Sequence, residues 1–537
     1  MAAPRRLPLS WPAAWTVGAA AFFAAFVFRA RVVVDGTAYY TLFDDAMISM
    51  QYARNLAAGH GLVWNAGDVP VEGITNPLWT LWMALLHLTG APEAKLGLAV
   101  ALTSAALLLA QLGVVRRIAA EVCEREPAVA DGALILVALS YAMAFWSLRG
   151  MEVGALSCLV AVGALAVLRL RHGWTARRGA ALAAVVALLP LVRMDGAVPA
   201  VVLAAFAALF APPGRRGRAA AMLLGALAAS VAVQTALRLA YYGDLLPNTY
   251  YLKMAGVPLA LRLERGWHVL AEEIGLRLWP LLAFPVLLGP RLADRRVLLL
   301  LCLAGSQLAY SVWVGGDAWE WMSHSNRYVT AAVPALAVLA AAGLAALRDP
   351  VAHVLGALVP RRGGARASAG PMSPRTSLWF VRVAAVAVAA HVSGAAFAEW
   401  ARTRGAHVHD DGEAVTAALR VRQATTPDAT IAVVWAGAVP YFSHRRAVDL
   451  LGKSDRVLAR LAAREPFLPG HVKWDYRYSI GRWRPDAVLQ LWQPTAADYH
   501  YLTDAGYDRL DTQLFVRRDS RAVDRPRLEA GVRGLLR

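Results

Sequence analysis

The stretch that decides the fold begins at Phe43-Asp44-Asp45-Ala46, where two adjacent carboxylates follow the first strongly apolar segment. Two further polar stretches, Tyr52-Ala53-Arg54-Asn55-Leu56 and Val71-Glu72-Gly73-Ile74-Thr75-Asn76-Pro77, continue it. Charged groups next to a bilayer are costly and tend to mark a substrate path or a catalytic site. The alternative is a solvated loop or a helix start, because Asp is favoured in the first helical turn.

The composition around this stretch is that of a membrane protein. Of the 537 residues, 58% are hydrophobic and only 17% are charged, and the mean hydropathy is +0.44. Globular proteins carry about half apolar and about a quarter charged residues. We therefore predict a polytopic α-helical membrane protein.

The net charge of +18 raises the possibility of nucleic-acid binding. The arginines, however, lie in the connections between the apolar runs and form no single basic face. They cluster at 5–6, 116–117, 169–178, 215–218, 291–296 and 361–362, in short connections such as the positive-inside rule assigns to cytoplasmic loops. The basic composition thus indicates topology and excludes a nucleic-acid partner.

The three cysteines, Cys123, Cys158 and Cys302, lie in or beside apolar segments and have no metal-like spacing. Neither a disulfide framework nor a zinc site is indicated. The run from 11 to 29 has no small-residue cleavage site before Arg29, so we interpret it as a retained first helix and not as a cleaved signal.

Eleven apolar runs predict about 11 transmembrane helices, near 11–29, 95–115, 132–149, 153–170, 179–192, 196–211, 219–240, 274–289, 297–314, 327–347 and 378–398. Several are shorter than the ~20 residues a span needs, so broken or tilted helices are expected in the middle of the bundle. The short run from Pro77 to Leu88 suits an interfacial helix. With eleven spans, the arginine clusters lie on the cytoplasmic side of the membrane, and the polar loops that contain the motifs lie on the extracytoplasmic side.

The chain divides into two parts. Residues 1–399 form the predicted catalytic membrane domain, and 400–537 return to soluble composition and form a predicted extracytoplasmic α/β domain. The strands expected in it are 429–435, 447–451 and 486–491. Residues 360–377 are a linker rich in Gly, Ser, Pro and Arg, and no internal repeat is evident.

Asp44 and Asp45 are the candidate catalytic residues. Transfer of a sugar from a lipid phosphate to a hydroxyl needs a base near the acceptor, and two neighbouring carboxylates can have their pKa values pushed apart. The sequence does not decide between them. A divalent ion is the less favoured use of the pair, because no other acid lies at ligand spacing nearby.

Further polar residues fall on the same predicted face. Glu152 is either a site residue or an ordinary acid at a helix start, and Arg193 with Asp195 is either a structural ion pair or a phosphate ligand. The segment from Tyr241 to Lys253 can be an aromatic belt or a sugar-stacking and phosphate-binding element. The segment from Gly315 to Arg327 adds Asp317 and His324, although a lone His is more often structural.

These motifs together resemble GT-C type glycosyltransferases, and in particular the terminal β-(1→2)-arabinofuranosyltransferase family of actinobacteria. The resemblance rests on the segments quoted above, on Gly59 to Asn65, and on Tyr242 to Thr249, Val314 to Asp317, Asp449 to Gly452 and Pro469 to Lys473. It implies a polyprenyl-phosphate sugar donor, an acidic catalytic residue at Asp44 or Asp45, and an extracytoplasmic C-terminal domain that holds a polysaccharide. Two residues depart from the family pattern: Met194 stands where the family has Pro, and Met47 stands where an aromatic or larger aliphatic residue is common. These departures leave the identity of the transferred sugar undetermined.

The predicted function is transfer of a sugar, with D-arabinofuranose favoured, from decaprenyl phosphate to a cell-envelope glycan such as arabinogalactan or lipoarabinomannan. The rivals are a lipid-linked sugar transporter or flippase, which would usually show internal repeats, and a non-catalytic glycan-binding partner of another transferase. The expected location is the cytoplasmic membrane, with the bilayer, the lipid donor and the glycan acceptor as partners and no cofactor.

The candidate substrate-binding residues share polar or aromatic side chains in loops predicted to lie outside. They are Arg54, Glu72, Asn76, Glu152, Arg193, Asp195, Asp244, Asn248, Tyr250, Lys253, Asp317, His324, Arg327, His471, Lys473 and Trp474. The last three belong to an apparently exposed segment, 471–478, which mixes aromatic rings with polar groups. It is expected either to bind glycan or to dock the domain onto the helices.

Overall fold

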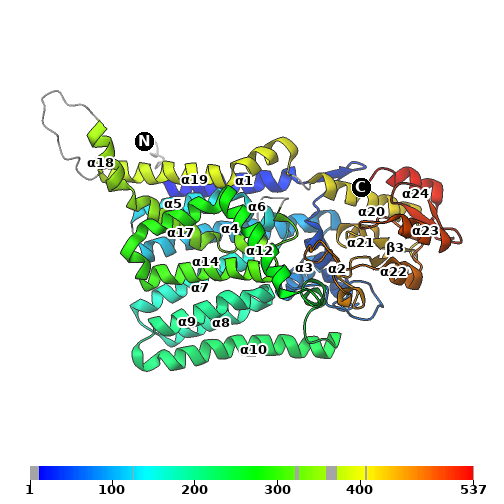
Figure 1. Ribbon diagram of the computed structural model, residues 1–537, viewed down its shortest axis with the longest axis horizontal. Helices are drawn as coiled ribbons and strands as arrows, with labels where there is room; N and C mark the ends of the chain where they lie inside the picture. The colour runs from blue at the N-terminus through cyan, green and yellow to red at the C-terminus, as the bar shows by residue number, and fades with distance from the viewer. Residues whose placement is uncertain (1–10, 125, 321–325, 359–371, 406–407, 536–537) are drawn as a thin grey trace, which may run out of the picture.

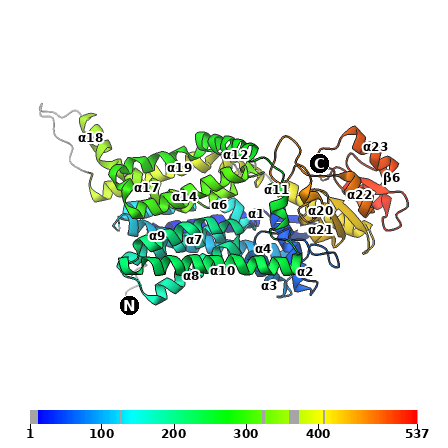
Figure 2. The same ribbon diagram turned by 60° about the horizontal axis from the view of Figure 1, so that its bottom comes forward.

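The computed structural model describes residues 11–124, 126–320, 326–358, 372–405 and 408–535. Long helices lie side by side in a bundle, and the C-terminal domain sits beyond one end of it (Figure 1). The turned view in Figure 2 keeps this arrangement, with α10 along one side of the bundle and the C-terminal sheet at its end. The predicted fold class, a polytopic helical protein with a C-terminal α/β domain, is confirmed.

Seven described helical segments are long and apolar enough to cross a membrane. They are α1 (Trp11–Arg29), α4 (Glu93–Val122), α7 (Val153–Arg169) with the short η1 (Leu170–His172), α10 (Arg216–Tyr242) with η3 (Pro213–Arg215), α14 (Arg295–Val314), α17 (Val333–Ala346) with α18 (Arg348–Leu358), and α19 (Pro374–Thr403). Each coincides with one of the predicted apolar runs. The chain is therefore a multi-pass membrane protein.

The other four predicted runs are short or broken, as their lengths indicated. They form the pair α5 (Pro127–Ala138) and α6 (Tyr141–Leu148), bent by 50°, then α8 (Ala176–Val192), α9 (Ala197–Phe210), and the series η4 (Ile274–Leu278), α13 (Trp279–Ala283) and η5 (Phe284–Ala293). The series includes a π-helical turn at η4 and a kink at Gly289, whose φ of 51° is one that L side chains rarely adopt. Irregular backbone inside a bundle is tolerated where other protein elements cover it.

A layer of shorter elements joins the long helices, and one of them, at 259–273, packs along α14. They are the hairpin β1 (Val32–Val34) and β2 (Thr37–Tyr39), and the helices α2 (Asp44–Ala57), α3 (Pro77–His87), α11 (Asn248–Lys253), α12 (Leu259–Glu273) and α16 (Arg327–Thr330). The turn η2 (Met194–Gly196) lies where α8 and α9 meet. This layer carries the polar motifs identified in the sequence.

The C-terminal domain is built on a five-stranded sheet with the order β4-β3-β5-β7-β6. The parallel strands β3 (Thr430–Val433) and β5 (Ala487–Val488) lie within predicted segments, and β4 (Arg446–Asp449) overlaps the predicted segment 447–451 but begins one residue earlier. The strands β6 (Tyr507–Arg509) and β7 (Phe515–Arg517) extend the sheet with antiparallel pairing. The helices are α20 (Val408–Ala424), α21 (Ala438–Ser443), η6 (Leu458–Arg460), α22 (Tyr476–Trp483), α23 (Ala496–Asp504) and α24 (Arg525–Val532).

Most of the segment 471–478 is buried and only Arg477 is exposed, so the expectation of an exposed segment is wrong. His471 is buried (4% exposed), as are Lys473 (1%), Trp474 (6%) and Tyr476 (3%). Trp474 and Tyr476 pack with Val434, Leu450 and other apolar side chains of the domain's own core. The aromatic rings that looked like a sugar platform in the sequence are used to build the domain.

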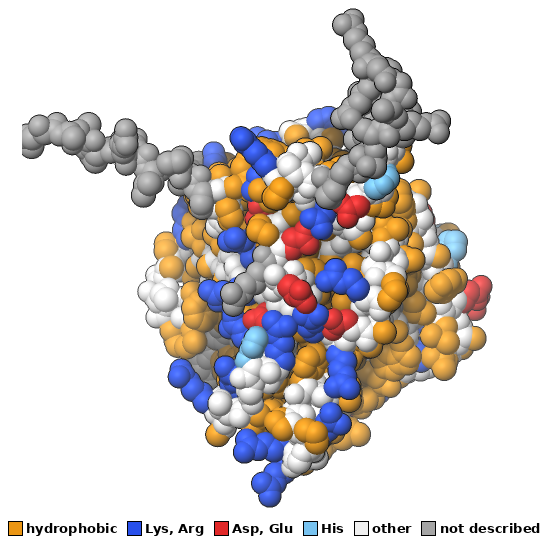
Figure 3. Space-filling view, turned by 90° about the vertical axis from the view of Figure 1, so that its left-hand side faces the viewer, with side chains coloured by type: hydrophobic (Ala, Val, Ile, Leu, Met, Phe, Trp, Pro, Cys, Tyr) orange, Lys and Arg blue, Asp and Glu red, His pale blue; other side chains and the backbone are white. Residues whose placement is uncertain are grey.

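The end of the bundle opposite the C-terminal domain is basic. Figure 3 shows Lys and Arg side chains gathered on this end, where α7 ends and where α8, α10 and α14 begin. Exposed arginines there include Arg171, Arg177, Arg178, Arg215, Arg216, Arg218, Arg291 and Arg295. The cluster at 361–362 lies outside the described residues. This end of the bundle thus carries most of the described arginine clusters that the sequence placed in short connections.

Candidate active site

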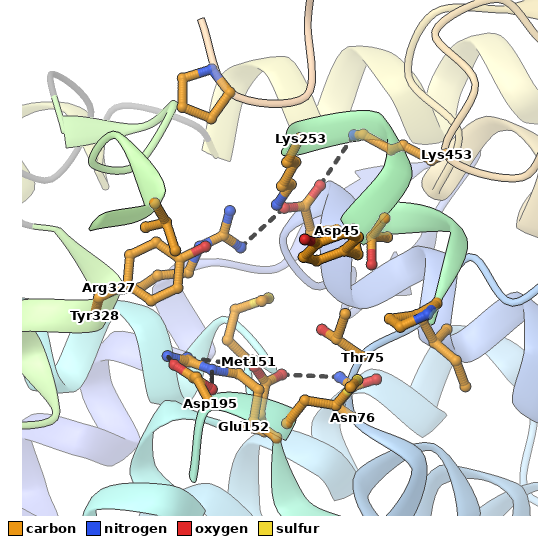
Figure 4. A pocket seen from close by; sticks show the side chains of 18 of the residues that line it. Asp45, Thr75, Asn76, Met151, Glu152, Asp195, Lys253, Arg327, Tyr328 and Lys453 are labelled. Carbon is orange, nitrogen blue, oxygen red and sulfur yellow. Dashed lines mark hydrogen bonds and ion pairs between the residues drawn. The ribbon is translucent and has the colours of Figure 1, made fainter. Parts of the chain in front are cut away.

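A cavity of about 200 Å³ opens at the end of the bundle that faces the C-terminal domain. Its polar lining falls into two groups that face each other in Figure 4. One group contains Asp45, Lys253, Arg327 and Lys453, and the other contains Asn76, Glu152, Arg193 and Asp195. Aromatic side chains complete the wall: Tyr250, Tyr310, Trp313 and Tyr328.

Asp45 is held by two cations from distant parts of the chain. It stands in the first turn of α2, whose start is fixed because Phe43 donates its backbone N–H to the Arg149 carbonyl at 2.8 Å. Lys453 Nζ lies 3.0 Å from Asp45 Oδ1, and Arg327 Nη1 lies 2.9 Å from Asp45 Oδ2. Both carboxylate oxygens are therefore engaged by positive charge.

The cations determine the ionisation of Asp45. Burial opposes its negative charge, but Lys453, Arg327 and Lys253 outweigh burial and hold the pKa of Asp45 well below its ordinary value. Burial, reinforced by the nearby Arg327, lowers the pKa of Lys253 to about 8. At neutral pH the cavity thus presents an ionised Asp45 and a largely protonated Lys253.

Lys253 differs from the other cations of the cavity. Arg327 also pairs with Asp317, at 2.9 Å between Nε and Oδ2, and Lys453 pairs with Asp45. Within the part of the chain that the structure describes, Lys253 Nζ has no ion pair or hydrogen bond. Its aliphatic stem passes Gly470, where an added Cβ would come within 3.2 Å of Cε. Lys253 is thus a cation available to an incoming anion.

Asp44 has a different role from its neighbour. Its Oδ1 accepts hydrogen bonds from the backbone N–H groups of Gly437 (3.1 Å) and Ala438 (3.0 Å), at the start of α21. A Cβ at Gly437 would lie 2.6 Å from Asp44 Oδ1, so the two backbones meet here without room for a side chain. Burial raises the pKa of Asp44 to about 6, against the opposing charge of Lys453. Asp44 fastens the C-terminal domain to α2, and only Asp45 lines the cavity.

The second polar group is a connected network on the opposite wall. Asn76 Nδ2 donates to Glu152 Oε2 at 2.8 Å, and Arg193 Nη1 lies 3.5 Å from Glu152 Oε1. Arg193 also forms a bidentate ion pair with Asp195, and its guanidinium lies 5.1 Å from the centre of the Tyr328 ring. Glu152 is the N-cap residue of α7, as the helix-start alternative expected, but its side chain makes no capping hydrogen bond and belongs to this network instead. Arg193 and Asp195 are paired, as the structural alternative expected, and they also line the cavity.

Four predicted residues hold the two parts of the protein together outside the cavity. Arg54 donates to the Tyr441 carbonyl of α21, and Asp244 pairs with Arg456 at 3.0 Å and with Arg460 at 2.6 Å. Asn248 Nδ2 donates to the carbonyls of Gly452 (2.9 Å), Lys453 (3.0 Å) and Asp455 (3.2 Å). Lys473 Nζ donates to the carbonyls of Tyr251 (2.8 Å), Ala255 (2.7 Å) and Ala459 (2.9 Å).

Of the remaining predicted residues, four are buried beside the cavity or in the C-terminal domain, and one lies outside the described residues. Glu72 pairs with Arg238 of α10, and Asp317 orients Arg327. His471 lies among Trp319 (5.2 Å), Trp435 (6.3 Å) and Trp492 (5.4 Å), and burial next to Lys453 lowers its pKa to about 3, so its ring is neutral. Trp474 lies in the core of the C-terminal domain. His324 lies outside the described residues.

Sequence reasoning missed Lys453. It follows the segment Asp449-Leu450-Leu451-Gly452, and it is one of only four lysines in the chain, which is the signal that could have marked it. Asp449 shapes this loop, because its carboxylate accepts from the N–H groups of Leu451 (2.9 Å), Gly452 (3.1 Å) and Ser454 (2.7 Å). The loop carries Lys453 from the C-terminal domain into the cavity.

No three His, Cys, Asp or Glu side chains among the described residues come together as metal ligands would. The expectation that the protein needs no cofactor stays a prediction.

Comparison with known proteins identifies the fold. The structure of ArnT from Cupriavidus metallidurans bound to undecaprenyl phosphate is 13% identical and covers 82% of this chain and 86% of that chain, with a TM-score of 0.52. The chain has the GT-C fold. Two further solved structures match with TM-scores below 0.5. The Archaeoglobus fulgidus oligosaccharyltransferase tethered with an acceptor peptide is 13% identical, with 81% of this chain and 64% of that chain covered and a TM-score of 0.49. The arabinosyltransferase EmbB from Mycobacterium smegmatis is 15% identical, with 75% and 39% covered and a TM-score of 0.37.

The C-terminal part matches a family of its own. Residues 400–524 match the family described as "Domain of unknown function (DUF8728)". Among curated proteins, no significant match was found.

Proposed function

We propose that this GT-C protein is a membrane glycosyltransferase that moves a sugar from a polyprenyl-phosphate donor to a cell-envelope polysaccharide. D-Arabinofuranose on decaprenyl phosphate is the favoured donor, because the sequence motifs resemble the terminal β-(1→2)-arabinofuranosyltransferase family. The likeness in fold to a transferase bound to undecaprenyl phosphate supports a lipid-phosphate donor.

One observation carries the proposal. The cavity at the polar end of the bundle places the ionised carboxylate of Asp45 among the cations Lys253, Arg327 and Lys453. Such an arrangement has a group that can accept a proton and several that can bind a phosphate. These are the two requirements for sugar transfer from a lipid phosphate.

In the proposed reaction, Asp45 takes the proton of an acceptor hydroxyl while that oxygen attacks the anomeric carbon of the donor. The bond between the anomeric carbon and the phosphate oxygen breaks, and its electron pair stays on the phosphate. Lys253 and Arg327 stabilise the charge that grows there, Lys as a mobile point charge and Arg through its planar fork. Every proton and electron pair then has a destination within the cavity.

The network on the opposite wall is proposed to hold the sugar. Asn76, Glu152 and Arg193 offer acceptors and donors suited to sugar hydroxyls, and the rings of Tyr250 and Tyr328 offer apolar faces. A few oriented polar groups beside aromatic faces are typical of a site that binds a polar ligand specifically.

We propose that the C-terminal domain and the cavity face the extracytoplasmic side of the cytoplasmic membrane. The arginine-rich end of the bundle would then face the cytoplasm, as the positive-inside rule expects. The acceptor, a glycan such as arabinogalactan or lipoarabinomannan, would reach the cavity from the outer side, where the C-terminal domain (400–537) lies.

The test is transfer by the purified full chain. It would be incubated in nanodiscs with synthetic decaprenyl-phosphoryl arabinofuranose and a short glycan acceptor, and the products would be examined by mass and linkage analysis. Asp45→Asn is the matched variant, expected to lose about 10²–10⁴-fold in turnover while remaining folded. Equal turnover by Asp45→Asn and wild type would refute the assignment of the base, and no product from any polyprenyl-phosphate sugar would refute the function.

A further inference from the structure

We propose that Asp45 and the phosphate of the donor compete for the same cations, so that the phosphate releases Asp45 from Lys453 and Arg327 as the reaction proceeds. This inference rests on the proposed function and deepens it. It makes Lys453, which the C-terminal domain supplies, a residue that exchanges one anion for another within the catalytic cavity.

The cations of the cavity are neutralised by carboxylates of the same chain. The cavity and its immediate ion pairs contain four cations and four carboxylates, namely Arg193, Lys253, Arg327 and Lys453, and Asp45, Glu152, Asp195 and Asp317. Arg193 is neutralised on the far wall by Asp195 and Glu152. On the near wall, Asp45 stands where two cations converge, at 3.0 Å from Lys453 and 2.9 Å from Arg327.

This arrangement poses a chemical problem that the phosphate can solve. A carboxylate with both oxygens paired to cations is a weak base, because protonating it breaks two charge-assisted hydrogen bonds. An anion that takes over Lys453 and Arg327 would remove that penalty. The donor phosphate would arrive beside Lys253, the cation of the same wall that has no ion pair with any described residue, and would therefore lie within reach of Arg327 and Lys453.

The charges also balance through the reaction. The donor is a phosphodiester with roughly one negative charge, and the lipid monophosphate left after transfer carries about two near neutral pH. Meanwhile Asp45 goes from one negative charge to none as it takes the acceptor proton. The total negative charge on phosphate and Asp45 stays constant, so the cations need only move from the carboxylate to the phosphate.

Lys453 is suited to this exchange by its place in the fold. Its side chain is flexible, but its backbone is fixed by the turn around Asp449 and by Asn248, which binds the carbonyl of Lys453 at 3.0 Å. Its charge is buried (6% exposed), so it needs an anionic partner at every stage. In the structure that partner is Asp45, and after transfer it would be the phosphate.

The inference is tested by equilibrium binding of decaprenyl phosphate to the full chain in nanodiscs of uncharged lipid. Asp45→Asn imitates the protonated residue and frees both cations, and it should bind decaprenyl phosphate about fivefold or more tightly than wild type. Lys453→Met should bind it about fivefold or more weakly, with partial recovery in Lys453→Arg. Lys95→Met is the matched control, because Lys95 is exposed and donates only to the Ala38 carbonyl among described residues, at 3.2 Å.

The possible outcomes separate this inference from the proposed function. If wild type fails to bind decaprenyl phosphate, the proposed function is wrong. If wild type binds it but Asp45→Asn binds equally or more weakly, Asp45 organises the cations and does not compete with phosphate, and the inference alone is wrong. If Asp45→Asn does not fold, unchanged affinity in Lys453→Met would overturn the inference and a loss would support it. Inorganic phosphate and neutral decaprenol, titrated in parallel, separate headgroup from lipid binding.

Discussion

Replacing Asp44 by Asn should leave sugar transfer nearly intact, whereas the same change at Asp45 should abolish it. The two residues are adjacent in sequence and both are acidic, but Asp44 binds the start of α21 and Asp45 lines the cavity. In Asp44→Asn the carbonyl oxygen still accepts from Gly437 and Ala438. The amide nitrogen replaces Oδ2, a buried oxygen with no hydrogen-bond partner among the described residues.

The magnitude follows from the raised pKa of Asp44. The folded state holds this proton more tightly than the unfolded chain does, with a pKa of about 6 against an ordinary 3.8. The stability that Asp44 contributes is therefore fully present below about pH 4 and is lost as the pH rises through about 6. At about 1.36 kcal/mol per pKa unit, the loss is at most about 3 kcal/mol, and partial exposure of Asp44 lowers it to about 1–3 kcal/mol.

The assay combines thermal unfolding in nanodiscs with the transfer reaction. Asp44→Asn should melt close to wild type near pH 4 and at a higher temperature than wild type at pH 7.5, because it lacks the buried charge. Transfer by Asp44→Asn should stay within about threefold of wild type, while Asp45→Asn should lose about 10²–10⁴-fold. If Asp44→Asn loses transfer as severely as Asp45→Asn and gains no stability, Asp44 takes part in the chemistry and the division of roles is wrong.

Four further changes test other parts of the structure. Lys253→Met should lower kcat/KM for the donor by about 10–100-fold without changing the acceptor KM, and equal effects on both substrates would contradict a phosphate role. Lys473→Met leaves three carbonyls, one buried and two partly buried, without their donor and should cost about 3–5 kcal/mol, measured as a lower melting temperature; an unchanged melting temperature would show that water replaces the lysine. Trp474→Ala should likewise destabilise the C-terminal domain by about 3–5 kcal/mol, and a selective rise in acceptor KM would instead favour glycan binding there. A Cys at Gly217, where a Cβ meets nothing within 4 Å, should react with an impermeant thiol reagent only from the cytoplasmic side, and labelling from outside would reverse the topology.

The sequence predicted well what depends on local pattern. Apolar runs identified the helices, including the short and broken ones, because length and hydropathy are local properties. The strands of the parallel sheet were found for the same reason, as short apolar runs such as Ile431 to Val434. The strands β6 and β7 were missed, since at three residues each they leave no periodicity to detect.

The site was predicted only in part, because its geometry depends on contacts far along the chain. Asp45, Glu152, Arg193, Lys253 and Arg327 were named from polar residues in predicted outer loops, and all five line one cavity. The sequence could not separate Asp44 from Asp45, because the difference comes from the docking of α21. Lys453 was missed, since nothing near it indicates that its loop reaches α2.

The pairing of Asp45 with Lys453 also has a consequence for the making of the protein. The two residues are 408 positions apart, and the second is synthesised only after every membrane helix has emerged. A chain that has inserted its bundle but has not yet folded the C-terminal domain against it would lack the wall of the cavity that carries Lys453. Under the proposed function, such a nascent chain would be unable to bind its donor normally, so activity would begin only after the C-terminal domain has docked.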